Sequence, residues 1–211
     1  MNGYPVLKSG FRKTLAVFIL LLFFAAGCGG GKKIKSYAVD VRVLPAAPGK
    51  RPLRARLVLS AADALKNPNL SRTDGYILRE KTPLTTVLLK AVAGRMRAAG
   101  IMPLEEKEAA LSSGRLVVVL TRLESKLEKQ NWLASAAVRA ERYGRSGRPI
   151  GKWEAIGRGA HPDSRLSAGG AGLAMGKAIS QALNKLPWNQ IASNRPKTPP
   201  APSQPRRQRY R

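Results

Sequence analysis

The chain has 211 residues, of which 38 are Lys or Arg and 12 are Asp or Glu, so its formal net charge is +26. This excess of positive charge predicts an anionic partner or surface, and a hydrophobic fraction of 44% is enough for one packed core. The single cysteine excludes an intramolecular disulfide.

The first 27 residues have the layout of a signal peptide. A head with three basic residues and no acidic one precedes the uninterrupted apolar run Leu15–Ala26. As a helix this run would span roughly 18 Å, whereas the apolar core of a bilayer is about 30 Å thick. The sequence therefore favours a cleaved signal peptide over a permanent transmembrane helix.

The segment Ala25-Ala26-Gly27-Cys28, directly after this run, resembles the lipobox of bacterial lipoproteins. The resemblance implies cleavage between Gly27 and Cys28, a thioether-linked diacylglycerol on the Cys28 sulfur and an acylated amine. Because each buried CH₂ contributes about 0.8 kcal/mol, two or three acyl chains would hold the protein in membrane lipid. The alternative is an incidental cysteine in an ordinary signal peptide.

Residues 28–35 are predicted to form a flexible tether, since three glycines follow Cys28. In lipoproteins of diderm bacteria, an aspartate after the lipidated cysteine commonly signals retention in the inner membrane. Gly29 stands there instead, so the resemblance favours the periplasmic face of the outer membrane.

Residues 36–188 are predicted to form a single domain that begins with two strands. Apolar and polar residues alternate over 37–43 and again over 53–60, as in half-buried strands. Three prolines between them predict a loop, and residues 61–80 are expected to be mostly loop. Thr82-Pro83 then predicts the start of a helix, and Gly100 predicts its end. The residues between them form an apolar stripe at helical spacing.

The second half of the domain is predicted to contain three more strands and a helix. The apolar run 116–120 indicates a strand in the centre of the sheet, and 132–143 and 150–159 form a hairpin around a Gly-containing turn. A last helix is expected over 172–186, although two glycines blur its start. The predicted fold class is α+β, with two layers: an antiparallel sheet of about five strands and two helices packed on one face.

The final residues, 189–211, contain six basic and no acidic residues among several prolines, so we expect a disordered tail. Four arginines near its end are the candidate polyanion contacts: Arg206, Arg207, Arg209 and Arg211. Outside the cytoplasm the polyanions are anionic lipid, lipopolysaccharide and cell-wall glycan, which disfavours nucleic acid as a partner. The alternative is a basic surface without a specific partner.

The layout from Tyr37 to about Trp188 resembles the YajG-type family of small outer-membrane lipoproteins. The resemblance is carried by three segments: Val39–Arg42, Arg95–Ile101 and Leu116–Leu123. It implies residence in the cell envelope and supplies no reaction or catalytic residue. Small domains of this kind also resemble auxiliary lipoproteins of envelope transporters.

The chemistry-bearing residues do not form a recognisable active site. His161 is the only histidine, and we expect it in a solvated turn with Asp163 and Ser164. One His and one lipidated Cys cannot complete a typical zinc site. Glycines near 157–159 and 172–176 lack the spacing of dinucleotide or phosphate loops. Three glutamates are interpreted as a solvated face: Glu105, Glu106 and Glu108.

We therefore expect a non-enzymatic binding or structural module of the envelope, without a catalytic residue, metal or cofactor. The alternative is an accessory lipoprotein of a lipid-transport or assembly machine, with another envelope protein as its partner.

Overall fold

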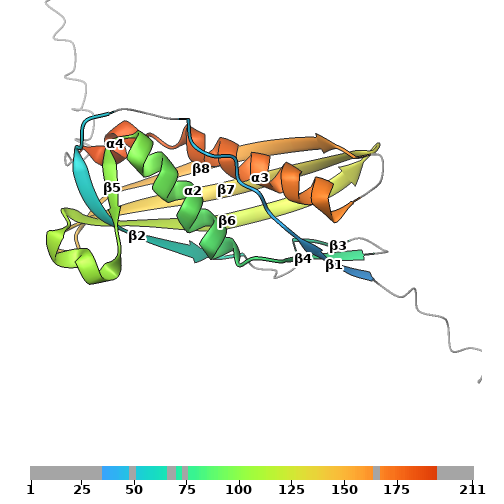
Figure 1. The fold of residues 1–211 in the computed structure, drawn as a ribbon, viewed down its shortest axis with the longest axis horizontal. Coiled ribbons are helices and arrows are strands. Elements are labelled where there is room, and N and C mark those ends of the chain that lie inside the picture. The colour runs from blue at the N-terminus through green and yellow to red at the C-terminus, as the bar shows by residue number, and fades with distance from the viewer. Residues whose placement is uncertain (1–34, 48–50, 66–69, 73–75, 164–166, 194–211) are drawn as a thin grey trace, which may run out of the picture.

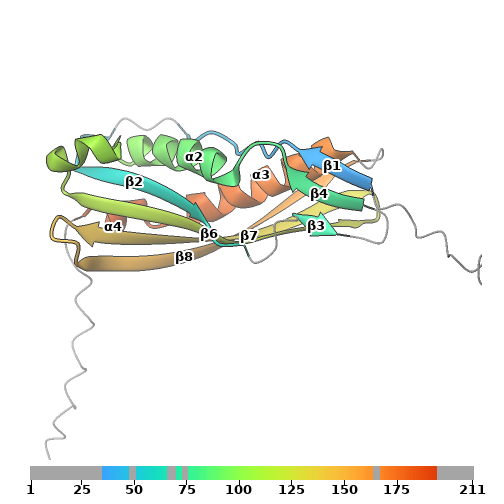
Figure 2. The ribbon, with the colours of Figure 1, turned by 90° about the horizontal axis from the view of Figure 1, so that it is seen from below.

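In a computed structural model of the chain, the described residues are 35–47, 51–65, 70–72, 76–163 and 167–193. They form a five-stranded sheet with two long helices, α2 and α3, on one of its faces, and a small three-stranded sheet at one end (Figures 1 and 2). The predicted α+β class, with two layers and both helices on one face, is confirmed.

The five-stranded sheet has the order β5-β2-β6-β7-β8. The apolar run at 116–120 belongs to β6 (Gly114–Glu128), the central strand, as predicted. The expected hairpin is also present, as β7 (Asn131–Gly144) and β8 (Pro149–Pro162). A second tight turn joins β6 to β7, where Lys129 and Gln130 adopt positive φ of 45° and 65°.

The prediction of a wholly antiparallel sheet is wrong. The strand β2 (Ala55–Asp63) pairs in parallel with both β5 (Ile101–Leu104) and β6. Parallel pairing requires a long crossover, which here includes the helix α2 (Leu84–Ala98). The local pattern of a strand identifies its buried face but not the direction of its neighbour.

The first predicted strand is shorter than expected and lies outside the main sheet. The strand β1 (Lys35–Val39) pairs in parallel with β4 (Tyr76–Glu80), whose other neighbour is β3 (Ser71–Arg72). The expectation of mostly loop over 61–80 is therefore wrong as well. After β1 the segment Asp40–Ala47 leaves the sheet and crosses the outer side of α3 (Ala168–Lys185) (Figure 1).

Two glycines on α3 make this crossing possible. A Cβ added at Gly172 would lie 2.3 Å from Asp40 O, and one at Gly176 would lie 1.9 Å from Arg42 O. The segment is further held by Ser180, whose hydroxyl oxygen accepts a hydrogen bond from Leu44 N at 2.8 Å. The residues that weaken the helix signal in the sequence are therefore the ones that tertiary packing requires.

The helix α3 also begins four residues earlier than predicted. The Ser167 hydroxyl caps it by accepting a hydrogen bond from Gly170 N at 3.0 Å. The Asp163 carboxylate in turn accepts from both the backbone N and the hydroxyl of Ser167, each at 2.7 Å. These contacts fix the start of the helix despite its glycines.

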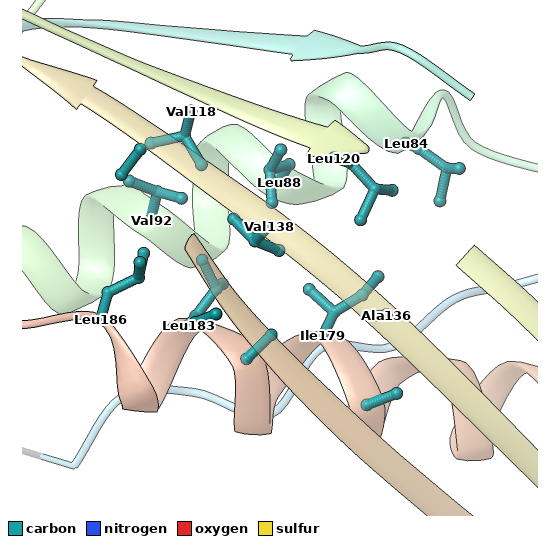
Figure 3. Packing of buried hydrophobic residues seen from close by; sticks show 14 of the residues in the cluster. Leu84, Leu88, Val92, Val118, Leu120, Ala136, Val138, Ile179, Leu183 and Leu186 are labelled. Atoms are coloured by element: carbon teal, nitrogen blue, oxygen red, sulfur yellow. The ribbon is translucent and has the colours of Figure 1, made fainter. Parts of the chain in front are cut away.

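The apolar stripe predicted for the first helix is the core-facing side of α2. Its side chains meet those of α3 and the sheet in one cluster (Figure 3). The cluster includes Leu88, Val92, Val118, Val138, Ile179 and Leu183. The end of the helix at Gly100, with φ of +77°, is as predicted. Thr82 is not its N-cap: the Glu80 carboxylate accepts from Leu84 N at 2.9 Å instead.

The ordered domain extends past the predicted boundary at residue 188. A short helix, α4 (Trp188–Ala192), buries Ile191 and Ala192 against the core. The Arg142 guanidinium donates to the carbonyls of Ile191 and Ser193. The expectation of disorder from residue 189 onward is thus wrong for α4, because its two apolar residues find a place on the core.

The predicted signal peptide with Gly27 and Cys28, residues 28–34 of the predicted tether and the four tail arginines lie outside the described residues. Lys35, the last residue of the predicted tether, is the first residue of β1. Among the helices that the structure describes, none is long and apolar enough to cross a membrane.

Candidate functional site

Among the residues that the structure describes, the candidates for catalysis or metal binding do not converge. His161 lies near the end of β8, half-buried, and not in a solvated turn as expected, because the hairpin strands continue through it. The three glutamates lie at the 3₁₀-helix η1 (Glu106–Leu111), largely exposed as predicted. Within the described ranges, no group of three or more His, Cys, Asp and Glu is placed to hold a metal ion.

The glycines of Gly157-Arg158-Gly159 serve packing. A Cβ on Gly157 or Gly159 would lie 2.0 Å from a carbonyl oxygen of α3. The helix therefore lies directly against the outermost strand of the sheet.

This close approach closes the β8 edge of the sheet. Three α3 side chains, spaced one helical turn apart, bond to backbone groups of β8 at 2.6–3.0 Å: Lys177 to Ala160 O, Gln181 to Arg158 N and Lys185 to Ile156 O. An exposed edge strand is a template for pairing with another chain. In the middle of β8, these contacts use the backbone groups that a further strand would otherwise bond.

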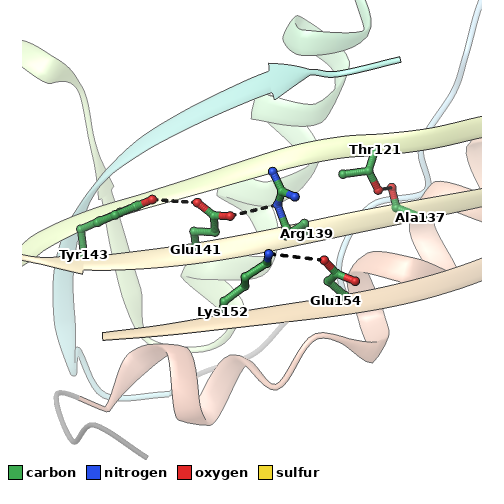
Figure 4. Close-up of polar contacts among 7 residues, drawn as sticks. All are labelled: Thr121, Ala137, Arg139, Glu141, Tyr143, Lys152 and Glu154. Atoms are coloured by element: carbon green, nitrogen blue, oxygen red, sulfur yellow. Dashed lines mark hydrogen bonds and ion pairs between the residues drawn. The ribbon is translucent and has the colours of Figure 1, made fainter. Parts of the chain in front are cut away.

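The sheet face opposite the helices carries rows of charged side chains. Ion pairs link residues two apart on one strand: Arg122–Glu124 at 2.6 Å, Lys126–Glu128 at 2.5 Å, Arg139–Glu141 at 2.9 Å and Lys152–Glu154 at 3.9 Å. Tyr143 donates to Glu141 at 2.7 Å, a hydrogen bond that raises the pKa of its phenol (Figure 4). Positive charge on this face is therefore largely balanced locally.

The Arg122–Glu124 pair gives a test of this balance. The hydrogen bond from Arg122 holds the pKa of Glu124 below its ordinary value. Because the pKa of this carboxyl is lower in the folded than in the unfolded state, its ionised form stabilises the fold at pH values above the unfolded-state pKa. This contribution is lost as the pH falls through the folded-state pKa. The contribution is small because both side chains are more than half exposed.

We expect Arg122→Gln to raise the pKa of Glu124 toward its ordinary value in an NMR titration. The control Lys152→Gln, on another strand, leaves the Arg122–Glu124 pair intact and should not move it. An unchanged Glu124 pKa in Arg122→Gln would contradict the assignment.

An apolar groove of about 700 Å³ lies between α2 and the segment Asp40–Ala47. Valines and alanines make up half of its lining residues, which also include Lys90 and Arg97.

Buried Arg95 connects the parts of this region, since it bonds to the segment and to both long helices. Its acceptors lie at 2.8–3.4 Å: Asn184 Oδ1, Ala91 O, Leu44 O and Ser180 O. Burial lowers its pKa. We assign Arg95 a structural role.

Part of the unpaired positive charge of the described residues lies at the end of the domain that carries α4 and η1. Four exposed arginines there have no ion pair within the described part of the chain, and we call this set the arginine-rich end: Arg54, Arg56, Arg145 and Arg148. They come from the start of β2 and from the β7–β8 turn.

Sheet pairing brings these two regions together. The Arg56 carbonyl accepts from both the backbone N and the hydroxyl of Ser113, each at 2.8 Å. The next residue, Gly114, pairs with Gly144 at the turn that carries Arg145. Residues nearly 90 positions apart in the sequence thus meet at one end of the sheet.

Two hollows open on this end. One, of about 280 Å³, is lined by Arg54, Arg142 and three polar residues: Ser113, Asn189 and Ser193. The other, of about 500 Å³, is lined by Arg115 and Arg145 among others. Arg142 is buried, which lowers its pKa, while Arg115 pairs with Glu106. Guanidinium groups and hydroxyl or amide donors together are suited to bind carboxylate or phosphate oxygens.

The arginine-rich end was not predicted from the sequence. The tail arginines were predicted as the polyanion contacts because four of them lie within six residues. The arginines of the domain are scattered in pairs through strand ends and a turn, so only the sheet register shows that they are neighbours.

No protein-family model and no curated protein matches the chain. Solved structures similar to it include lipoprotein GNA1162 from Neisseria meningitidis, with 11% identity and a TM-score of 0.38, covering 53% of this chain and 88% of that one. A minor lipoprotein from Acinetobacter baumannii has 12% identity and a TM-score of 0.37, covering 68% and 95%. PelC from Paraburkholderia phytofirmans, a dodecamer, has 15% identity and a TM-score of 0.37, covering 65% and 92%.

Two of these three proteins are lipoproteins by name. With TM-scores below 0.5, the likenesses assign neither a family nor a function to this chain. The resemblance to the YajG-type family is not confirmed.

Proposed function

We propose that the protein is a lipid-anchored, non-enzymatic binding module of the cell envelope, held at the periplasmic face of the outer membrane by acyl chains on Cys28. The observation that carries this proposal is the order of basic head, apolar run, small residues and Cys28. Gly29, where an inner-membrane retention signal would have aspartate, favours the outer membrane.

The described domain is compatible with such a role. Its basic residues outnumber its acidic ones. On the sheet face opposite the helices, here called the open sheet face, basic residues are paired with carboxylates, whereas the four arginines of the arginine-rich end have no ion pair among the described residues. Electrostatic attraction to a polyanion acts over about 8–10 Å at physiological salt. A lipid anchor would confine this surface to the narrow space next to a membrane.

Cys28→Ser tests the anchor directly. We expect the native protein to start at residue 28 and to carry the added mass of a diacylglycerol and an amide-linked acyl chain. The variant should lack this mass and move from the membrane to the soluble fraction, because it has lost every acyl chain. Mass spectrometry of the purified N-terminus and fractionation on a density gradient measure both effects.

Ser36→Ala is the matched control, since it changes a polar residue near the same end and leaves the lipidation pattern intact. A native protein that keeps its first methionine, or an unmodified Cys28 thiol, would refute the proposal. Lipidated protein found in inner-membrane fractions would refute only the outer-membrane part.

A further inference from the structure

We infer that the arginine-rich end is a binding surface for a carboxylate-bearing cell-wall glycan, held away from the membrane that anchors the chain. The orientation part of this inference rests on the proposed lipid anchor at Cys28. The binding surface itself consists only of described residues. Three properties of the structure support it: uncompensated charge, donor chemistry and position.

The charge of this end differs from that of the open sheet face. Four basic residues on that face each have a carboxylate within 4 Å: Arg122, Lys126, Arg139 and Lys152. Arg54, Arg56, Arg145 and Arg148 have no such partner among the residues that the structure describes. The same end also carries the glutamates of η1, of which Glu105 pairs with Lys107 and Glu106 with Arg115. The four arginines therefore outnumber the one remaining carboxylate of η1, Glu108, and a polyanion is attracted to the end more strongly than to the face.

The donors suit carboxylates. Each guanidinium presents paired N–H groups at the spacing of the two carboxylate oxygens. The hollow beside Arg54 adds Ser113, Asn189 and Ser193 as hydroxyl and amide groups. A glycan offers hydroxyl and amide groups to such side chains, whereas a lipid bilayer presents a plane of phosphates.

The position of this end separates it from the anchoring membrane. Cys28 and Lys35, the first residue of β1, are seven residues apart and can be separated by at most about 25 Å. The strands β1, β3 and β4 lie at one end of the long axis, and α4 and the β7–β8 turn lie at the other (Figures 1 and 2).

The strand β7 alone runs for 14 residues along this axis, or about 43 Å. When the domain stands on its anchored end, the arginine-rich end lies well outside the Debye length of the anchoring bilayer, about 8 Å. Cell-wall glycan is the polyanion then within reach. The chain continues from Ser193, at this same end, with six further basic residues.

The test uses the chain from residue 28 with Cys28→Ser, so that no acyl group contributes to binding. One variant replaces Arg54, Arg56, Arg145 and Arg148 with Gln. The matched control replaces four exposed basic residues elsewhere with Gln: Arg79, Lys81, Lys90 and Arg158. Both variants lose the same charge, and thermal unfolding checks that both are folded.

Binding is measured by cosedimentation with purified sacculi and with vesicles that contain anionic phosphatidylglycerol, at low and high salt. We expect the arginine-end variant to bind sacculi about tenfold more weakly than the parent chain, as the loss of four modest ion pairs implies. The control variant should lose less than threefold, and vesicle binding should change equally in both variants.

Equal weakening of sacculus binding in the two variants would overturn the inference, since net charge alone would then explain it. Loss of vesicle binding alone in the arginine-end variant would identify lipid as the ligand and would also overturn it. Failure of the anchor is detected separately as an unmodified Cys28 in the native protein. An unmodified Cys28 would overturn the proposed orientation of the domain on the membrane, but it would not affect the difference in sacculus binding between the two variants.

Discussion

Replacing Gly176 with alanine is expected to lower the free energy of unfolding by about 2 kcal/mol or more, although alanine is the better helix former. The added Cβ would lie 1.9 Å from Arg42 O and 2.5 Å from the carbonyl carbon, so a backbone would have to move. The displaced segment also carries the Leu44 hydrogen bond to Ser180. Urea-induced unfolding of the Cys28→Ser chain, followed by circular dichroism, measures the change.

Gly169→Ala is the matched control in the same helix. Gly169 is exposed, and its nearest contact for an added Cβ is Ser167 Oγ at 3.5 Å. This substitution should leave stability unchanged or raise it by up to about 1 kcal/mol, since only the helix propensity changes. Similar stability of the two variants would mean that the segment Asp40–Ala47 does not press on α3 as described.

The second large effect is expected at α4. Ile191 is fully buried, and its carbonyl accepts a hydrogen bond from buried Arg142. Ile191→Ala removes most of the apolar contact and leaves a cavity, which costs about 2–5 kcal/mol. If α4 shifts as a result, the Arg142 guanidinium also loses acceptors in a buried setting. The same unfolding experiment tests this prediction.

Asn189→Ala is the control, since Asn189 is an exposed residue of the same helix whose described side-chain bond is to exposed Arg51. It should change stability by no more than about 0.5 kcal/mol. Equal effects of the two substitutions would show that α4 is not part of the core. Experiments that delete the basic tail should therefore begin at residue 194, so that α4 is kept.

The apolar pattern predicted the parts of the fold that depend on near neighbours. The β-branched run of β6, the Gly-containing turn between β7 and β8 and the stripe of α2 each identify an element and its buried face. The partner of a strand depends on distant residues. The pattern therefore did not predict that β1 lies outside the main sheet or that β2 pairs in parallel with its neighbours. Ile191 was likewise predicted to belong to a disordered tail, because the residues around it are mostly polar. It is buried because α4 packs against the core.

The glycines of α3 and β8 show the same difference between local preference and tertiary packing. In the sequence, Gly172 and Gly176 are weak helix formers, and Gly157 and Gly159 are weak strand formers. In the fold, each one faces a backbone that would clash with a Cβ. Packing between distant segments outweighs local preference because a backbone overlap costs more than a propensity difference.

The sequence by itself determined the predicted export and lipidation pattern ending at Cys28, the excess of basic residues, the α+β class and the faces of the main strands and helices. These features depend on residue type and on short-range periodicity. Only the tertiary structure decided that Arg54 and Arg56 lie near Arg145 and Arg148, and that the charges of the open sheet face pair among themselves. Charge balance depends on distances of a few ångströms between side chains, and the sheet register sets those distances.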